Sequence, residues 1–487
     1  LSPDISVLMD ESIAHVAGND ALIQKMKYIQ QQPSAVWMDS TATITAANGD
    51  GRSTLIDHLD AALLQQAYYA EVDGEMSPMA IVIIVYNLPD RDCAAFASNG
   101  KLIQVGQDGA TYDPGVLGMG YANYRDEYIA PIKAAFSDPK YASLRIVAML
   151  EPDSFPNMIT NTNEAGASEQ NGSLNPDPAS LPSEGYCDKI LSFNNPTVVP
   201  AVTNEGTDDN PNLGLYADSL RLAIKELDEA SAINDNNIYT YMDIGHAGWL
   251  GWDVDDDLTD EYAGYDGNAN GLRDSMESNM KRGVKYFKQL VDGADGSLDG
   301  NGLDMIRGFA SNTSGYTPVE DPYITNSKVY EDVLALEDFY QFNASVDELT
   351  YVGRLNEYFT TSDPDAYFGT QAFDQANLGF IIDTARNGWG VDANRPAPGS
   401  VTPGTDGTLR VDTRVHRGHW CNVNDAGVGE VPKASPSAAN PHLDAFFWMK
   451  PPGESDGISF DIADYPVGSA SYNALDDIEK AIVDQSK

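Results

Sequence analysis

Acidic side chains follow several apolar segments of this chain, and their types and positions could perform acid–base chemistry. Residues 146–150 form an apolar, partly β-branched run that stops at Glu151-Pro152-Asp153. Pro152 has a fixed φ angle and donates no backbone hydrogen bond, so a strand should end there. Burying a carboxylate beside a core strand is costly unless it has a partner or serves a site. We therefore expect one of these carboxylates to point into a cavity beyond the strand.

Polar residues follow other apolar segments in the same way. Arg91 and Asp92 follow one segment, and later segments are followed by Asp243 with His246, by Asn312, by Asp383 with Arg386, and by Lys450. In α/β barrels this end of the sheet carries the active site. Several carboxylates around one cleft, without a paired nucleophile and base, favour acid–base hydrolysis of glycosides. The alternative is ordinary loop polarity, which aspartates at so many strand ends make weaker.

The elements that must position these residues alternate between two patterns. Short apolar runs predict strands, and longer stretches with a helical period lie between them. This repetition predicts an α/β fold, a distorted (β/α) barrel of about seven parallel strands with long active-site loops. The predicted strands are 36–39, 79–88, 144–150, 238–243, 305–310, 378–383 and 443–449, and helical patterns cover 55–72, 128–136 and 216–227.

Composition excludes some classes of partner. The chain has 74 acidic and 29 basic residues and a formal net charge of −45. This charge repels nucleic acid and anionic lipid, and no apolar run approaches the roughly 20 residues of a membrane helix. Segments 162–214 and 390–419 are rich in turn-forming residues, and loops of this length are usually functional. We see no repeat or linker and expect one catalytic domain over residues 1–487.

Two further features have alternative interpretations. The three cysteines allow either one disulfide with a spare thiol or three reduced thiols. Residues 266–277 fit the calcium-loop template, with ligands from Asp266, Asn268, Asn270, the Leu272 carbonyl and Glu277. Arg273, however, takes a place that is usually apolar, and no helix obviously precedes the loop. The loop is therefore either a structural calcium site or an acidic turn, and we expect no cofactor for catalysis.

Several segments resemble glycoside hydrolase family 6, the inverting cellulases. Residues 86–93, Tyr-Asn-Leu-Pro-Asp-Arg-Asp-Cys, resemble its first signature, and residues 151–154 resemble its second. Phe155 stands where the family usually has Leu or Ile. The similarity continues in family order through residues 241–252, 307–316, 380–390, 416–422 and 444–457. It implies hydrolysis of β-1,4-glucosidic bonds in cellulose with inversion.

The resemblance implies catalytic roles for five residues. Asp153 matches the general acid, and Asp92 matches the carboxylate that keeps it protonated, because a nearby like charge raises one carboxyl's pKa. Ser98 matches a hydroxyl that helps to hold the hydrolytic water. Tyr86 matches a tyrosine that crowds the sugar toward a distorted ring. Asp456 matches an aspartate sometimes proposed as the base, and inversion needs roughly 6.5–9.5 Å between acid and base carboxyls.

The resemblance also implies a substrate-binding surface. The groups matching hydrogen-bond partners of sugar hydroxyls are Asp243, His246, Asn312, Lys450 and Glu454. The groups matching stacking platforms, whose flat rings cover the axial C–H bonds of glucose, are Trp37, Trp249, Trp252 and Trp420. Arg91 and Arg386 should orient carboxylates, whereas Trp389 and Trp448 have no match and should be structural. Without the resemblance, His246 could equally be a histidine satisfied inside a packed loop.

The resemblance finally bears on location and mode of action. Cys93 and Cys187 match a family disulfide, which implies an oxidising, extracellular setting and a secreted protein. Cys421 matches a cysteine whose usual partner does not follow here. Segment 390–419 resembles the bacterial cellobiohydrolase branch, which releases cellobiose from non-reducing chain ends. The segment after Gly457 is shorter than in that branch, so an endoglucanase with an open cleft is the alternative and a non-catalytic cellulose-binding protein a remote one. We expect cellulose and cello-oligosaccharides as partners, and a monomer.

Overall fold

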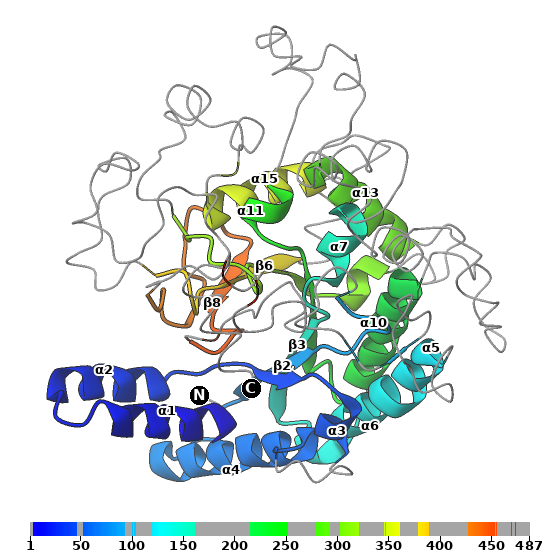
Figure 1. The fold of residues 1–487 in the computed structure, drawn as a ribbon. Helices are drawn as coiled ribbons and strands as arrows, with labels where there is room; N and C mark the ends of the chain where they lie inside the picture. Colours follow the sequence, from blue (N-terminus) through cyan, green and yellow to red (C-terminus); the bar gives the residue numbers. More distant parts are fainter. Residues whose placement is uncertain are drawn as a thin grey trace, which may run out of the picture.

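A curled, mostly parallel β-sheet forms the frame of the protein (Figure 1). The computed structural model describes residues 3–45, 52–92, 100, 102–103, 119–160, 215–251, 279–292, 302–320, 345, 347–360, 378–388, 427–452, 454, 469 and 473. The strand order is β1-β2-β3-β4-β5-β6-β8-β7. The strands are β1 Val36–Met38, β2 Met79–Val85, β3 Leu144–Leu150, β4 Ile238–Asp243, β5 Gly308–Ser311, β6 Gly379–Asp383, β7 Lys433–Ala434 and β8 Leu443–Phe447.

The predicted α/β barrel of about seven parallel strands is confirmed. Strands β1 to β6 and β8 pair in parallel, and the two-residue β7 adds an antiparallel edge to β8. The N–H of Ala35, just before β1, donates to the carbonyl of Trp448, just after β8, at 2.9 Å. This bond draws the two ends of the parallel series together, so the sheet curls into a distorted barrel.

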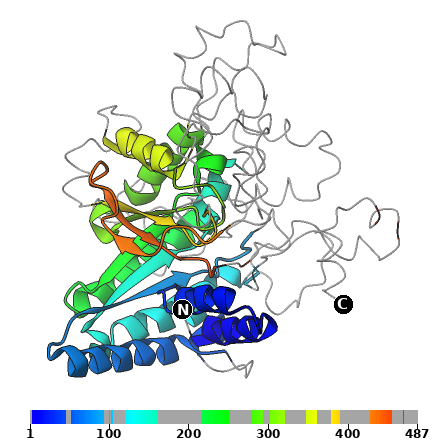
Figure 2. The same ribbon diagram turned by 90° about the vertical axis from the view of Figure 1, so that its left-hand side faces the viewer.

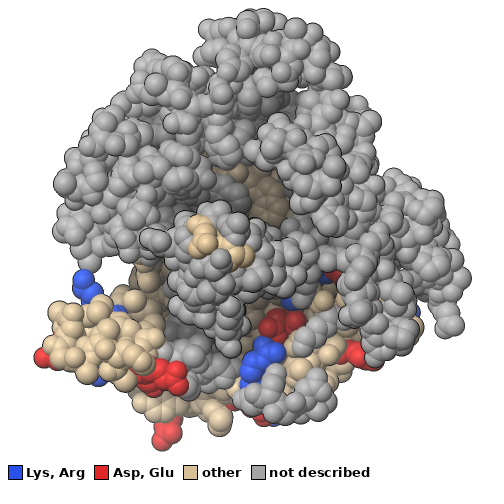
Figure 3. Space-filling view, viewed as in Figure 1, with Lys and Arg blue, Asp and Glu red and all other residues tan. Residues whose placement is uncertain are grey.

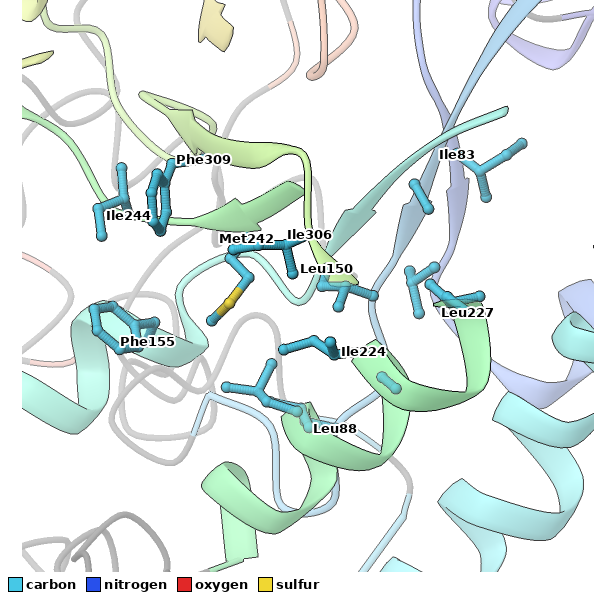
Figure 4. Packing of buried hydrophobic residues seen from close by; sticks show 14 of the residues in the cluster. Ile83, Leu88, Leu150, Phe155, Ile224, Leu227, Met242, Ile244, Ile306 and Phe309 are labelled. Atoms are coloured by element: carbon cyan, nitrogen blue, oxygen red, sulfur yellow. The ribbon is translucent and has the colours of Figure 1, made fainter. Parts of the chain in front are cut away.

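Alternation along the strands produces two apolar layers, because successive side chains point to opposite faces. In β2, Ile83 and Val85 join the layer between the sheet and the helices. Val82 and Ile84 join a smaller layer inside the barrel, together with Met149. Figure 4 shows part of the outer layer, where Leu150 and Met242 of the sheet lie near Ile224 of a covering helix. Burial on both faces explains why these strands are almost continuously apolar.

Two of the predicted helices form as expected. Helix α10 (Leu215–Ile233) buries Tyr216, Leu220, Ile224 and Leu227 along one face. Helix α4 (Leu55–Asp73) begins with a capping box between Thr54 and Asp57 and ends at Gly74, which has a φ of 78°. The other α-helices among the described residues are α1 Pro3–His15, α2 Asp20–Gln30, α3 Thr41–Ile44, α5 Gly120–Asn123, α6 Ala130–Phe136, α7 Ser154–Thr160, α11 Ala247–Leu250, α13 Asn279–Asp292 and α15 Glu348–Thr360.

Several predicted boundaries differ from the structure, and three of these differences affect the elements described below. The helix expected over 128–136 begins earlier, as the π-helix η2 (Tyr124–Ile129), and continues as α6. The strand expected over 305–310 begins at Gly308, because η6 (Gly302–Met305) is a 3₁₀ turn. The strand expected to reach Leu88 ends at Val85, because the N–H groups of Asn87 and Leu88 bind the Glu151 carboxylate instead of a neighbouring strand.

The periphery carries the N-terminal helices and much of the visible charge. Figures 1 and 2 place α1 and α2 beside α4 at one edge of the molecule. In Figure 3 the described acidic side chains occupy several separate places on this face, some of them beside basic ones. The ion pair of Arg52 with Asp39, at 3.0 Å, is exposed in this way and should add little stability. Within the described residues, no helix is both long and apolar enough for a membrane crossing.

Candidate active site

The carboxyl ends of three neighbouring strands place the candidate residues along one edge of the sheet. Val85, Leu150 and Met242 are register partners in β2, β3 and β4. The residues that follow them therefore emerge at the same level: Tyr86, Glu151 and Asp243. The predicted gathering of polar residues at this edge is confirmed by direct hydrogen bonds among their loops.

The two carboxylates of the Glu-Pro-Asp segment have different environments. Glu151 is fully buried and its carboxylate binds protein groups, whereas Asp153 is partly exposed. Asp153 has a φ of 67°, a left-handed conformation that aspartate tolerates better than most residues. Its N–H donates to Asp243 Oδ2 at 3.0 Å, which fixes the backbone. Asp153 is therefore the carboxylate of this segment with access to the space beyond the strand.

Asp243 supports Asp153 from the end of β4. The same Oδ2 atom also accepts a hydrogen bond from the Gly245 N–H at 3.2 Å. Burial raises the pKa of Asp243 well above its ordinary value, and the charge of Asp153 raises it further. Asp243 is predicted to bind a sugar hydroxyl. The hydrogen bonds that the structure shows for it come from the backbone N–H groups of Asp153 and Gly245.

Asp92 is buried in the loop that follows β2. Its carboxylate accepts a hydrogen bond from the Tyr86 hydroxyl, and the Arg91 Nε lies 3.7 Å from its Oδ2. Burial raises the pKa of Asp92 to about 7, and the negative charge of Asp153 adds to this effect. Because repulsion between like charges is mutual, the two carboxyls favour a state in which they hold one proton between them.

Arg91 and Trp37 fix the ring of Tyr86. The Arg91 guanidinium lies 3.8 Å from the centroid of that ring and donates to the carbonyls of Tyr86 and Asp39. The Trp37 ring meets Tyr86 edge to face, with centroids 5.3 Å apart. Arg91 therefore lies against Asp92 as expected for an orienting residue, and the Tyr86 hydroxyl is held on the Asp92 carboxylate.

Lys450 and Trp37 lie together on the neighbouring wall. The Lys450 Nζ is 4.5 Å from the centroid of the Trp37 ring and 3.8 Å from Glu454 Oε1. Trp37 Nε1 donates to the Met449 carbonyl at 2.8 Å, which fixes the plane of the indole. Three of the predicted substrate-binding groups, one aromatic and two charged, are thus brought together by the structure.

His246 and Trp249 lie together after β4, and Trp249 forms another wall of the site. His246 is fully buried, and its Nδ1 lies 3.2 Å from Thr317 Oγ1. Burial lowers the pKa of His246 to about 3, assisted by the positive charge of Arg386, so the imidazole is neutral. Its ring lies 6.0 Å from that of Trp249, which is partly exposed. The burial of His246 is the feature expected of a histidine inside a packed loop.

Asn312 and Arg386 hold loops against one another. The Asn312 Nδ2 donates to the carbonyls of Thr317 at 3.0 Å and Asp383 at 3.1 Å, which uses both of its N–H bonds. Arg386 donates to the carbonyls of Thr313 at 2.9 Å and Glu454 at 3.0 Å. The prediction gave Asn312 a sugar hydroxyl, but in the structure its two amide donors serve the backbone. Asn312 thus has a supporting role in the structure, and its contact with a sugar hydroxyl stays a prediction.

Asp383 is buried beside these loops. It accepts hydrogen bonds from the N–H groups of Lys450 at 2.8 Å and Ala385 at 2.9 Å. Burial raises the pKa of Asp383 to about 7, and the positive charge of Arg386 opposes the rise. Arg386 thus acts on a carboxylate through its charge, although its hydrogen bonds go to carbonyls.

Two buried glutamates, Glu151 and Glu348, support the site, and the sequence alone did not predict this role for either of them. Glu348, the first residue of α15, accepts hydrogen bonds from the Ala247 N–H at 2.8 Å and from the Ser311 hydroxyl. Burial raises the pKa of both Glu348 and Glu151 to about 8. The place of Glu151 directly after a buried strand was a usable signal. Glu348 had none, because an acidic residue in the first turn of a helix is ordinary.

Other predictions have mixed outcomes. Trp448 is structural as predicted: it is 1% exposed, and its Nε1 donates to the Glu430 carbonyl at 2.8 Å. Among the described residues, no cluster of His, Cys, Asp and Glu could hold a metal ion. The predicted residues that lie outside the described ones are Ser98, Asp456, Trp252, Trp389, Trp420, Cys93, Cys187, Cys421, Asp266, Asn268, Asn270, Leu272 and Glu277.

Comparisons with known proteins agree with this geometry. The model of a family described as Glycosyl hydrolases family 6 matches residues 2–175 and 197–481. Exoglucanase A of Cellulomonas fimi is 33% identical over 470 residues, which are 95% of this chain and 41% of that protein. This chain therefore spans less than half the length of that relative.

Solved structures show the same likeness. The catalytic domain of Cellulomonas fimi Cel6B aligns with a TM-score of 0.63 and 31% identity, covering 95% of this chain and 81% of that one. An endoglucanase, Cel6B from Humicola insolens, aligns with a TM-score of 0.52 and 22% identity, covering 93% and 88%; this likeness shows the fold alone. The resemblance inferred from residues 86–93 and 151–154 is confirmed. The chain belongs to glycosyl hydrolase family 6.

Proposed function

We propose that this protein hydrolyses the β-1,4-glucosidic bonds of cellulose with inversion. The observation that carries the proposal is the carboxyl pair at the edge of the sheet. Asp153 is partly exposed and held by Asp243, while Asp92 is buried, bonded to Tyr86 and repelled by the charge of Asp153. Such a pair retains a proton at a pH where an isolated aspartate has lost it, as a general acid requires.

The arrangement supports the following sequence of steps. Asp153 gives its proton to the glycosidic oxygen as the bond from that oxygen to the anomeric carbon breaks. A water molecule attacks the same carbon from the opposite face and loses its proton to a base, so the configuration inverts. We propose Asp456 as the base and Ser98 as a partner of the water; both lie outside the described residues. The base then releases the proton it took to solvent, and Asp153 takes one proton back from solvent, so that the Asp92–Asp153 pair again holds one proton.

The walls of the site support a glucan substrate. Trp37 and Trp249 are partly exposed aromatic rings on either side of the edge that carries Asp153, and sugar faces stack on such rings. Lys450 and Glu454 lie beside Trp37 and offer charged hydrogen-bond groups to equatorial hydroxyls. A repeated array of aromatic and polar groups suits a β-1,4-glucan, whose hydroxyls all lie at the rim of each ring.

We propose the exo mode, in which cellobiose leaves the non-reducing end of the chain. Support comes from Exoglucanase A, which matches most of this chain, and from the resemblance of segment 390–419 to the cellobiohydrolase branch. The endo mode is kept as the second candidate, because an endoglucanase shares the fold. Viscosity loss of a soluble cellulose derivative, measured against reducing sugar released, separates the two modes.

The proposed substrate also supports a location. Cellulose is a solid polymer that cannot enter a cell, so we propose that the protein is secreted and acts as a monomer. The proposed Cys93–Cys187 disulfide would suit an oxidising exterior. We also propose that residues 266–277 bind a structural calcium ion; all of these residues lie outside the described ones.

Release of reducing sugar from amorphous cellulose tests the proposed activity. The wild-type protein should release it, and Asp153→Asn should lower turnover by roughly 10²–10⁴, the usual contribution of a positioned acid. Asp235→Asn is a matched control, because Asp235 is also an aspartate with positive φ, 58°, but is exposed in the turn before β4. Equal loss in both variants, or none in Asp153→Asn, would remove Asp153 from the mechanism.

A further inference from the structure

Glu151 is placed at the centre of a buried hydrogen-bond network. Its Oε2 accepts hydrogen bonds from the N–H groups of Asn87 at 2.9 Å and Leu88 at 3.1 Å. Its Oε1 accepts one from the Tyr124 hydroxyl at 2.8 Å. The side chain is fully buried, so each of these bonds replaces water that the carboxylate cannot reach. The β2 loop and the end of β3 are therefore held at one distance by a single side chain.

The π-helix η2 supplies the second half of the network. Tyr124 and Tyr128 are both fully buried, and their rings stack with centroids 5.6 Å apart. The Tyr128 hydroxyl donates to the Met38 carbonyl and accepts from the Tyr86 N–H, the latter at 2.8 Å. The wider turn of a π-helix is uncommon and is often found beside functional sites. Here it brings two hydroxyls under the ends of the strands.

The network connects the strand ends that carry the reacting groups. Met38 ends β1, directly after Trp37; Tyr86 follows β2, in the loop that leads to Asp92; and Glu151 follows β3, two residues before Asp153. The N–H of Glu151 also donates to Val85 of β2 at 2.7 Å. The network contacts neither Asp92 nor Asp153 directly through these bonds, so its effect on them passes through the backbone.

We propose that Glu151, Tyr124 and Tyr128 are positioning residues that set the separation between the Asp92 and Asp153 carboxyls. The inference rests on the proposed function for its kinetic consequence, although the geometric consequence is independent of it. The wall that carries Trp249 lies after β4, outside the network, and among the network's side chains Tyr128 is the one that bonds the strand of Trp37. Removing the Tyr124–Glu151 bond should therefore lower turnover and leave substrate binding nearly unchanged.

Hydroxyl and carboxyl substitutions provide the kinetic test. Tyr124→Phe removes the donor to Glu151 and should lower kcat on cellohexaose about 10- to 100-fold, the effect of a displacement near 1 Å, with KM changed less than about twofold. Glu151→Leu should behave in the same way. Glu151→Gln should restore kcat to within about threefold, because its carbonyl can accept from both N–H groups while its amide donates to the Tyr124 hydroxyl.

Tyr141→Phe is the matched control. Tyr141 is also buried and donates its hydroxyl to a carboxylate, Asp60, at 2.7 Å, but it lies at the opposite end of β3. This variant should melt at a lower temperature with wild-type kcat and KM. Tyr124→Phe with wild-type kcat, when the wild-type enzyme is active, would show that the network contributes stability alone and overturn the inference.

Crystal structures decide the geometric claim without activity. The Asp92–Asp153 carboxyl separation in Tyr124→Phe should differ from that of the wild type by more than about 0.5 Å, the tolerance of a catalytic geometry. An unchanged separation overturns the inference whether or not the protein hydrolyses cellulose. Failure of the wild type to release sugar would instead reject the proposed function, and the two structures would still decide the role of the network.

Discussion

Replacing Asp92 by asparagine should stabilise the protein at alkaline pH while lowering its activity. Asp92 is buried, and its pKa is raised from 3.8 to about 7, mainly by burial. A raised pKa means that the folded state binds the proton more tightly than the unfolded state does. The folded protein therefore loses stability as the pH rises from 3.8 toward 7, and below 3.8 the group costs nothing.

The size of the effect follows from the same values. At about 1.36 kcal/mol per pH unit, a rise from 3.8 to about 7 corresponds to roughly 4 kcal/mol as an upper bound. Asparagine is close in shape, can accept from the Tyr86 hydroxyl and has no charge to bury. The free energy of unfolding of Asp92→Asn should thus equal that of the wild type near pH 4 and exceed it by up to about 4 kcal/mol at pH 8.

Urea unfolding of both proteins at several pH values measures this difference. Glu151, Glu348 and Asp383 are also buried carboxyls with raised pKa, but they are present in both proteins and cancel in the comparison. Parallel curves from pH 4 to pH 8 would refute the reasoning, because Asp92 would then have the same pKa folded and unfolded. If the wild type instead became more stable relative to Asp92→Asn as the pH rises, the predicted sign of this free-energy difference would be wrong.

Four other outcomes are expected. The first product released from a β-1,4 glucan should be the α-anomer by NMR, and a β-anomer appearing first would contradict inversion. The His246 imidazole, whose pKa is lowered to about 3, should stay neutral from pH 5 to pH 8, so its ¹⁵N shifts should not titrate there. Glu348→Ala should destabilise the fold by about 1–3 kcal/mol, since it leaves the Ala247 N–H without its acceptor, and an unchanged melting curve would contradict that role. Chelation should lower the melting temperature, and calcium at a hundredfold excess over Kd should return about 2.7 kcal/mol; Glu277→Gln should abolish the response, and a melting curve indifferent to chelator would leave residues 266–277 an acidic turn.

The sequence predicted the sheet well, because the signal for a buried parallel strand is local. Apolar, β-branched runs such as 144–150 match the observed strand at both ends. The strand predicted over 305–310 begins at Gly308 in the structure, because contact with the neighbouring strand β6 sets where it starts. A Cβ atom on Gly308 would lie 1.8 Å from the Gly379 carbonyl, and periodicity contains no information about such a close approach.

The candidate acid could be located from sequence, whereas its supports could not. The position of Glu151 and Asp153 after a strand indicates that one of them faces a cavity, and the family resemblance points to Asp153. Tyr128 opens the helix predicted over 128–136 and Tyr124 lies outside it, because nothing local indicates that a π-helix precedes the α-helix. Their hydroxyls matter only through contacts with residues 38, 86 and 151, which are distant in the chain.

Backbone conformation shows why these supports are needed. Asp92, Glu151, Asp153 and Asn312 all have positive φ, between 47° and 67°, and none of them is glycine. Such residues cost of order 1–3 kcal/mol each and persist only where surrounding contacts determine them. Three of them are held by bonds to neighbouring strand ends, Glu151 to Asn87, Asp153 to Asp243 and Asn312 to Asp383, and Asp92 is held by Tyr86 of its own loop. The site is thus a set of unfavourable local conformations that tertiary hydrogen bonds stabilise, so removing a support should relax the backbone before it unfolds the barrel.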